Sequence, residues 1–362
     1  MAFTRLGATI GPVVAAARPV GHATRIIAAS AAIVAHAPSS CQFQHSVFAQ
    51  LALPARRPGP TVHSWSARNG AVFCNIDAGS AVDPRTGRHM PLALPWGIKA
   101  RLLLIELNTQ AVRQRSPIVD VGTTLTAFTR GLLQRRPKGR ETRAIKAQLL
   151  SLAAAHVTLG FISSGCATHE KSEIVEGFKL WAVDATESRG WWPRVVKLSS
   201  GYFADLVEHA VPLDPRAIAA LSHSALALDV YQWLSQRLHR VPIGRHQLVP
   251  WVSLHGQFGG RPTRLDLFRR EFRGALRAVQ RVYPTARVLD FVDARGWPHG
   301  LKLFCSPPPV PVRPFTRSRR AHFSGAAAPI SSDNPIGPDN RPDSARDTRA
   351  RSASPRSSGK SR

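Results

Sequence analysis

The segment Phe268–Pro284, FRREFRGALRAVQRVYP, has the spacing of a helix with two different faces. At about 100° per residue, one stripe carries apolar side chains, namely Phe268, Phe272, Leu276, Val279 and Tyr283. The opposite stripe carries Arg270, Arg273, Arg277 and Arg281. Solvated helix faces usually interleave acids with bases, but only Asp266 and Glu271 lie near these arginines. The pattern therefore predicts one face in a core and one face that binds anions.

The whole chain shares this excess of positive charge. Its 362 residues include 49 Lys and Arg against 22 Asp and Glu, which gives a net charge of +27. Such a balance indicates a polyanionic partner, either nucleic acid or an anionic membrane surface. Because nearly all of these cations are Arg rather than Lys, a compositional bias toward Arg is an alternative source of the charge.

Cysteine spacing and hydropathy exclude several classes of protein. The four cysteines, Cys41, Cys74, Cys166 and Cys305, have no C-x-x-C pairing, so neither a disulfide framework nor a metal site is predicted. We interpret the segment CATHEK, residues 166–171, as a loop. No run approaches the roughly 18 apolar residues of a membrane span. These features favour a reducing, cytoplasmic compartment and no membrane partner.

The two ends of the chain differ in composition from its middle. Residues 1–46 are Ala-rich without a clean period, so we expect a disordered or mis-started leader, although Ile26–Pro38 has the outline of a signal-peptide core. Residues 47–93 are expected to be an irregular or β lead-in. Residues 310–362 are a Ser/Arg/Pro/Asp mixture that cannot bury enough apolar surface to fold, which predicts a disordered basic tail.

Residues 94–190 have the element order of a winged helix. Helices are predicted over Lys99–Val112, Thr123–Leu132 and Glu141–His156. Two β segments, HVTLGFIS and FKLWAVD, follow and are expected to pair as a hairpin. Three helices followed by a hairpin predict a first winged-helix domain.

Residues 191–309 repeat that order at greater length. VVKLS is a predicted strand, Asp214-Pro215 caps a helix, and LALDVYQWLSQRLHR is a strongly amphipathic helix. Trp251–Phe258 is the next predicted helix. The helix with the arginine stripe, Phe268–Pro284, follows and is called the Arg-striped helix below. ARVLDFVD and LKLFCS then form a final hairpin. The predicted fold is therefore mainly α with small β-hairpin wings, an α+β chain of two tandem winged-helix domains with disordered ends.

The Arg-striped helix occupies the recognition position of a helix-turn-helix. We expect Thr263–Tyr283 to enter a DNA major groove with its first turns closest to the bases. The candidates for base contact are Thr263, Arg264, Arg269, Arg270 and Arg273. Arg277 and Arg281 are expected to hold phosphates, which position a protein without reading sequence. In the first domain, the candidates for phosphate binding at the start of the third helix are Lys138, Arg140, Arg143 and Lys146.

Catalysis has little support in the sequence. There is no G-x-x-x-x-G-K-[ST] loop for nucleotide hydrolysis, and no H-x-H motif of the kind that a rolling-circle initiator needs. We therefore expect a protein that is not an enzyme and that needs neither a cofactor nor a metal.

The middle of the chain resembles the RepA-type plasmid replication initiators of bacteria. The resemblance covers about residues 47–309 and rests on the segments VFAQLALP, LPWGIKARLLLIELNTQAV, VKLSSGYF, VPLDPRAIAALSHSALALDVYQWLSQRL, LVPWVSLHGQFG and FRREFRGALRAVQRVYPTARV. It implies binding to repeated sites in double-stranded origin DNA, opening of adjacent DNA, recruitment of host replication proteins such as helicase or initiator, and self-repression. It also implies a homodimer as one of two forms. Gly274, inside the predicted recognition helix, departs from good helix composition.

Other interpretations stay open at this point. A winged-helix transcription regulator without an origin function would use the same groove chemistry. A membrane-surface or secreted basic protein with a cleaved N-terminal peptide belongs to a different class, and a decayed gene copy with a compositional Arg surplus is a third alternative. N-terminal sequencing of the mature chain would separate the secreted protein from the others.

Overall fold

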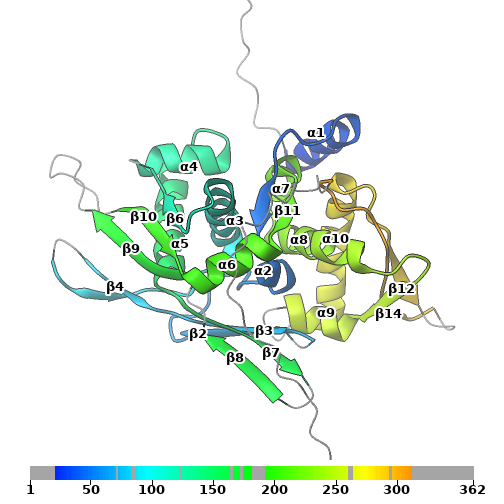
Figure 1. Ribbon diagram of the computed structural model, residues 1–362. Coiled ribbons are helices and arrows are strands. Elements are labelled where there is room, and N and C mark those ends of the chain that lie inside the picture. Colours follow the sequence, from blue (N-terminus) through cyan, green and yellow to red (C-terminus); the bar gives the residue numbers. More distant parts are fainter. Residues whose placement is uncertain are drawn as a thin grey trace, which may run out of the picture. The chain divides into compact units, whose positions relative to one another are not determined.

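The computed structural model describes residues 21–311 apart from 71, 84–85, 123, 164–165, 172–173, 182–191, 260–263 and 293–295 (Figure 1). All of these residues belong to one compact unit. Helices dominate, and the strands form small antiparallel sheets. The fold is therefore mixed α+β, as the sequence predicts at this coarser level.

A group of six elements brings together three helices and a small sheet. In chain order these elements are α3 (Gly97–Gln114), β6 (Ile118–Asp120), α4 (Leu125–Leu133), α5 (Gly139–Ala154), β9 (Val175–Trp181) and β10 (Trp192–Leu198). The strands form an antiparallel sheet in the order β6-β10-β9. In chain order, the first strand, β6, therefore pairs with the last strand, β10, and β10 also pairs with β9.

A second group repeats this order and pairing. Its elements are α8 (Ala225–Arg237), β12 (His246–Pro250), α9 (Trp251–Phe258), α10 (Leu265–Val282), β13 (Val288–Val292) and β14 (Pro298–Phe304). The sheet order is β12-β14-β13, and both pairings are antiparallel. The predicted final hairpin is confirmed, and β12 is an additional strand that the sequence analysis did not identify.

The remaining elements surround these two groups. A four-stranded sheet has the order β2 (Ser64–Asn69), β3 (Val72–Asp77), β7 (His156–Ser163) and β8 (Cys166–Lys171). Short pairs join β4 (Ser80–Val82) to β5 (His89–Pro91) and β1 (Gln42–Gln44) to β11 (Val211–Leu213). The other helices are α1 (His22–Ala35), α2 (Ser46–Gln50), α6 (Ser200–His209), α7 (Pro215–Leu221) and the short 3₁₀ helix η1 (Leu238–Arg240).

The predicted first wing is wrong in its pairing. HVTLGFIS, as β7, pairs with β3 and β8, whereas β9 pairs with β10. CATHEK forms strand β8 and is not a loop. VVKLS, which the sequence analysis placed at the start of the second domain, completes the sheet of the first group as β10. A boundary at residue 190 would therefore cut β10 from its sheet partners.

Residues 21–46 also differ from expectation, because they form α1 and β1. Ala is the best helix former, so the Ala-rich composition that suggested disorder supports a helix instead. Ile26 of α1 is buried against the core that contains α7 and α10. Arg216 Nη1 donates hydrogen bonds to Ala32 O (2.8 Å) and His36 O (2.9 Å), which satisfies carbonyls at the C-terminal end of α1. Packing and capping from distant residues thus fix this helix.

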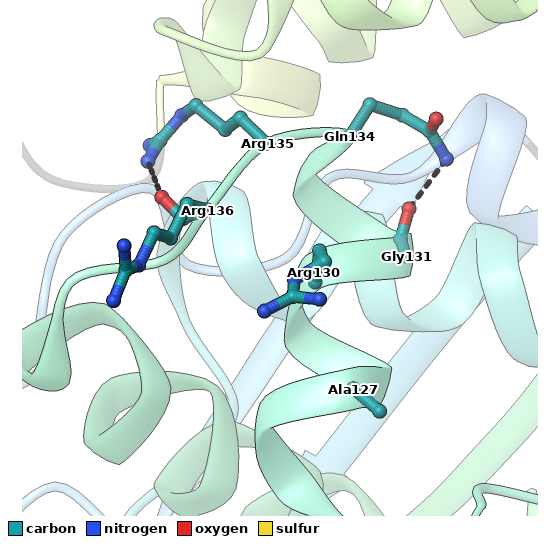
Figure 2. Close-up of a pocket in the computed structure, with 6 residues that line it drawn as sticks. All are labelled: Ala127, Arg130, Gly131, Gln134, Arg135 and Arg136. Atoms are coloured by element: carbon teal, nitrogen blue, oxygen red, sulfur yellow. Dashed lines mark hydrogen bonds between the residues drawn. The ribbon is translucent and has the colours of Figure 1, made fainter.

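The connection from α4 to α5 is short and turns at Gln134. Gln134 has φ 52°, in the left-handed region, and ends α4. Its side-chain Nε2 donates a hydrogen bond to Gly131 O over 2.6 Å, as drawn in Figure 2. After this bend α5 begins at Gly139, so that α4 and α5 form a helix-turn-helix within the first group.

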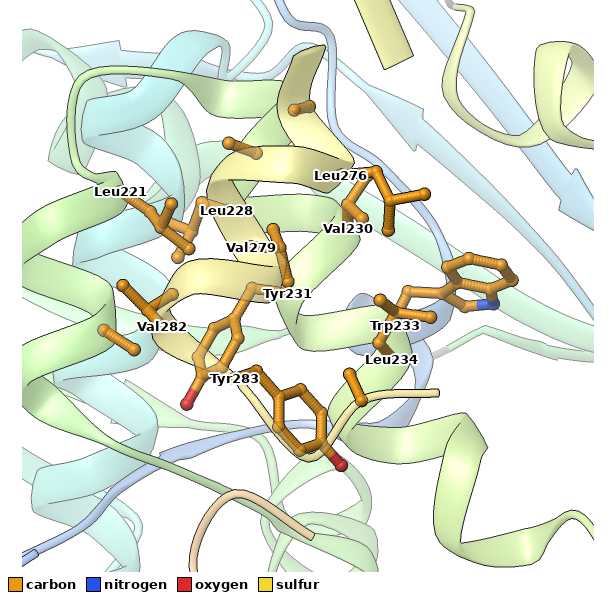
Figure 3. Close-up of a cluster of buried hydrophobic side chains, with 14 of the residues drawn as sticks. Leu221, Leu228, Val230, Tyr231, Trp233, Leu234, Leu276, Val279, Val282 and Tyr283 are labelled. Carbon is orange, nitrogen blue, oxygen red and sulfur yellow. The ribbon is translucent and has the colours of Figure 1, made fainter. Parts of the chain in front are cut away.

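A hydrophobic core forms between α8 and α10 (Figure 3). Helix α8 is buried all round from Ala227 to Gln236, as expected for a central helix. The predicted apolar stripe of α10 is confirmed, since all five of its side chains are at most 7% exposed. Trp233 and Trp251 are also buried and contact Phe272 edge to face. The inner face of α10 is therefore fixed by packing, which leaves its other face outward.

A buried ion pair joins α3 to α8. Arg101 Nε and Nη2 donate hydrogen bonds to the two carboxylate oxygens of Asp229, over 2.6 and 2.7 Å. The other N–H groups of Arg101 donate to the carbonyl oxygens of Leu53, Pro54 and Gly97. The pair is almost completely buried, and all five guanidinium N–H groups have an acceptor. It ties the two groups of elements together through their first helices.

Candidate nucleic-acid interface

The outward face of α10 carries the candidate site. Arg270, Arg277 and Arg281 are exposed, and none has a hydrogen-bond or ion-pair partner in the part of the chain that the structure describes. With a helical rise of 1.5 Å per residue, they extend over roughly 16 Å along the helix axis. Because Arg stays protonated, this face presents a row of fixed positive charge to solvent. The position of these arginines opposite the buried stripe agrees with the helical spacing, and the binding of anions by this face stays a prediction.

Arg273 differs from its neighbours because it has partners. Its Nη2 lies 3.2 Å from Asp290 Oδ1 on β13, and its guanidinium lies over the Trp251 ring, 5.1 Å from the centroid. The sequence analysis counted acids only along the helix and therefore missed Asp290, which the β13-β14 hairpin brings to α10. A phosphate or a base edge must compete with this carboxylate for Arg273.

The start of α10 is less open than the sequence suggested. Arg264 precedes the helix and pairs with Asp266, over 3.1 Å between Nη2 and Oδ2. This pair is well exposed to solvent and therefore weak. Arg269 is half-buried, and its Nε is buried without a hydrogen-bond partner. Thr263 lies outside the described residues.

Gly274 lies among the arginines on the outward face. A Cβ built at this position would meet no other atom within 4 Å, so no neighbouring group of the protein requires a glycine here. The absence of a side chain leaves the backbone of α10 accessible between Arg270 and Arg277. A ligand backbone can approach the helix closely at this point.

The predicted site in the first group surrounds the start of α5. Lys138, Arg140 and Arg143 are exposed, as expected for phosphate contacts. Lys146 is half-buried, and burial lowers the pKa of its ammonium group, while the Asp83 carboxylate acts in the opposite direction. The first three residues are therefore better placed to meet an anion in solution than Lys146.

Glu141 changes the electrostatics of the α5 start. Its Oε2 accepts hydrogen bonds from the Lys138 backbone N–H and from Arg135 Nη1, each over 2.9 Å. These bonds, with that from Arg135 foremost, lower the pKa of Glu141 to about 2. A carboxylate thus already occupies part of the positive end of this helix. A phosphate at α5 must rely on the basic side chains more than on the helix dipole.

Trp297 is a candidate that the sequence analysis missed. It lies between β13 and β14 and is 67% exposed, unlike the buried Trp233 and Trp251. The tip of this hairpin is where a wing would contact a nucleic acid backbone. The sequence predicted the hairpin, but the local sequence does not distinguish an exposed tryptophan from a buried one.

The described residues contain no group of three or more His, Cys, Asp or Glu side chains arranged to hold a metal ion. None of the helices in the described ranges combines the length and apolar character needed to cross a membrane. The site on α10 itself consists of guanidinium groups on a packed helix, which suits recognition of phosphate and base edges by hydrogen bonds.

One protein-family model matches part of the chain. Residues 94–252, from before α3 into α9, match the family model RepA_C, described as plasmid encoded RepA protein. The resemblance to the RepA family that was stated from the sequence is therefore confirmed over these residues, which make up less than half of the chain.

Two solved structures are similar at low identity. The crystal structure of SeMet derivatives of domain 2 and domain 3 of RctB aligns with a TM-score of 0.45 and 10% identity, over 69% of this chain and 93% of that one. The crystal structure of the RctB domains 2-3 aligns with a TM-score of 0.43 and 10% identity, over 72% and 96%. Among curated proteins no match was found.

Proposed function

We propose that this protein initiates plasmid replication by binding repeated sites in double-stranded origin DNA. In this proposal it also promotes opening of the adjacent DNA in the bacterial cytoplasm, recruits host replication proteins such as helicase or initiator, and represses its own gene. The RepA family match supports the replication role. The observation that carries DNA binding is the outward face of α10, with Arg270, Arg277 and Arg281 exposed and without partners.

The repeated element order supports two tandem winged-helix domains. In each group a helix, a strand, two helices and two strands follow one another, and the first strand pairs with the last. The third helix of such a unit is the one that enters the major groove. We assign this position to α5 in the first unit and to α10 in the second. The units then extend from α3 to β10 and from α8 to β14.

We assign a role in DNA binding to each arginine of α10 from the exposure of its side chain and from its hydrogen-bond or ion-pair partners. Arg270 is in the first half of the helix and is free, so we assign it to base edges, where Arg binds guanine with two hydrogen bonds. Arg277 and Arg281 are assigned to phosphates. Arg273 joins them when the DNA displaces Asp290. Thr263, Arg264 and Arg269 stay candidates at the start of the helix.

Origin opening in this proposal requires no catalytic group. The two recognition helices, α5 and α10, would bind successive major grooves. The binding energy would offset the cost of deforming the DNA between them. Strand separation and synthesis would then be completed by host proteins. A homodimer that represses the gene and a monomer that binds the origin are the two forms this proposal includes.

Binding to the DNA beside its own gene tests the proposal. The full chain is titrated against a native duplex from this region and against a scrambled duplex of the same composition, near physiological salt. We expect the native duplex to bind about 10³-fold or more tightly. Equal affinities that both fall steeply with salt would indicate a general phosphate clamp and contradict the proposal.

A winged-helix transcription regulator without an origin function is the alternative that shares this groove chemistry. The two are separated by the arrangement of the bound sites, determined by footprinting. Several direct repeats next to an A·T-rich segment support the initiator. A single inverted repeat over a promoter supports the regulator.

A further inference from the structure

The bend between α4 and α5 contains a second basic site, apart from the residues assigned above. An open hollow of about 620 Å³ is lined by Ala127, Arg130, Gly131, Gln134, Arg135 and Arg136 (Figure 2). Three of these six residues are arginines, and none is acidic. The composition of the hollow therefore favours an anion.

Two of the three guanidinium groups are available to a ligand. Arg130 and Arg136 are exposed, and neither guanidinium has a hydrogen-bond or ion-pair partner among the residues that the structure describes. Arg135 differs, because its Nη1 and Nη2 donate hydrogen bonds to both carboxylate oxygens of Glu141, over 2.9 and 2.5 Å. The Glu141 carboxylate is thus neutralised by Arg135 and does not compete for Arg130 and Arg136.

Small residues leave room between these side chains. Ala127 and Gly131 belong to the exposed side of α4, and a Cβ at Gly131 would meet nothing within 4 Å. Figure 2 shows Arg130 on this helix and Arg136 on the segment that follows it. The pair of Arg135 and Glu141, together with the bond from Glu141 to the Lys138 backbone, holds this segment in place. Arg130 and Arg136 are therefore presented on a fixed bend.

We propose that this hollow binds a phosphate group through Arg130 and Arg136, with Arg135 as a positioning residue. The forked donors of Arg match the oxygens of a phosphate. The phosphate can come from the backbone of bound DNA or from a free phosphate compound. The first source rests on the proposed function, because a duplex on α5 would place its backbone beside the bend that precedes this helix; the second source does not.

The test uses the full chain and the double variant Arg130→Gln/Arg136→Gln. Binding to the native duplex is measured over a salt series, and binding of inorganic pyrophosphate is measured by calorimetry. The control is Arg240→Gln/Arg245→Gln, which removes the same charge from two exposed arginines elsewhere. If DNA is the source, the double variant lowers the slope of log K against log salt by about 0.9, the value for one lost phosphate contact, and the control does not.

The remaining outcomes also decide the proposal. Loss of pyrophosphate binding in the double variant with an unchanged slope supports the hollow and assigns it to a free phosphate compound. No change in either measurement, or an equal change in slope for the control, overturns it. If the unmodified chain binds native and scrambled duplexes alike while the slope still falls by about 0.9 in the double variant, the proposed function fails and the phosphate site stands.

Discussion

Replacing Arg101 by Met removes the ion pair that joins α3 to α8. Asp229, only 7% exposed at its side chain, would then keep a buried carboxylate without a cation. The carbonyl oxygens of Leu53, Pro54 and Gly97 would lose their donors as well. Breaking a buried pair by removing one partner costs about 3–5 kcal/mol, and the three unsatisfied carbonyls favour the upper end of that range.

The assay is urea unfolding of the full chain, followed by far-UV circular dichroism. We expect Arg101→Met to lower the free energy of unfolding by about 3–5 kcal/mol. The double variant Arg101→Met/Asp229→Leu should recover part of this loss, because it leaves no buried charge. Arg240→Met serves as the control, since an exposed substitution changes stability by only about 0.5 kcal/mol. A loss below about 1 kcal/mol for Arg101→Met would refute the reasoning.

Three further predictions concern α5 and α10. Gly274→Ala should raise the free energy of unfolding by up to about 1 kcal/mol in urea, because Ala favours the helix and meets no neighbour; destabilisation would contradict an open site. Arg277→Gln/Arg281→Gln should lower the salt slope of duplex binding by about 1.8, whereas an unchanged slope would remove both from the contact. Glu141 should titrate near pH 2 by NMR, and Arg135→Gln should raise its pKa toward 4.5; because the folded pKa is the lower one, the stability from this pair is present above pH 4.5 and lost as the pH falls toward 2.

The parts of the fold that the sequence predicted are those with strong local periodicity. The two faces of α10 follow from its own residues, since a period of 3.6 determines which side chains share a face. The start of α7 follows in the same way, because Asp214 accepts a hydrogen bond from the Arg216 backbone N–H and Pro215 occupies the first helical position. Local rules were sufficient wherever the partner groups are close in sequence.

The errors concern contacts between residues that are far apart in sequence. HVTLGFIS and FKLWAVD were identified as β segments, but their pairing with β3, β8 and β10 is not revealed by any local pattern. The helix α1 is held by Arg216, 180 residues after the His36 carbonyl that it binds. At the candidate site, the outward arginines were predicted correctly, whereas the partner of Arg273 is Asp290 of another element. The competition between Asp290 and a bound anion for Arg273 could therefore be found only from the structure.

The most direct test of the central claim is the effect of Arg270→Ala on the preference for native over scrambled duplex DNA. If Arg270 reads a base from the major groove, the substitution costs about 1–3 kcal/mol on the native duplex and much less on the scrambled one. The preference should then fall by about 5-fold or more. Equal weakening on both duplexes would mean that α10 contacts only phosphates, which would contradict its assignment as the recognition helix.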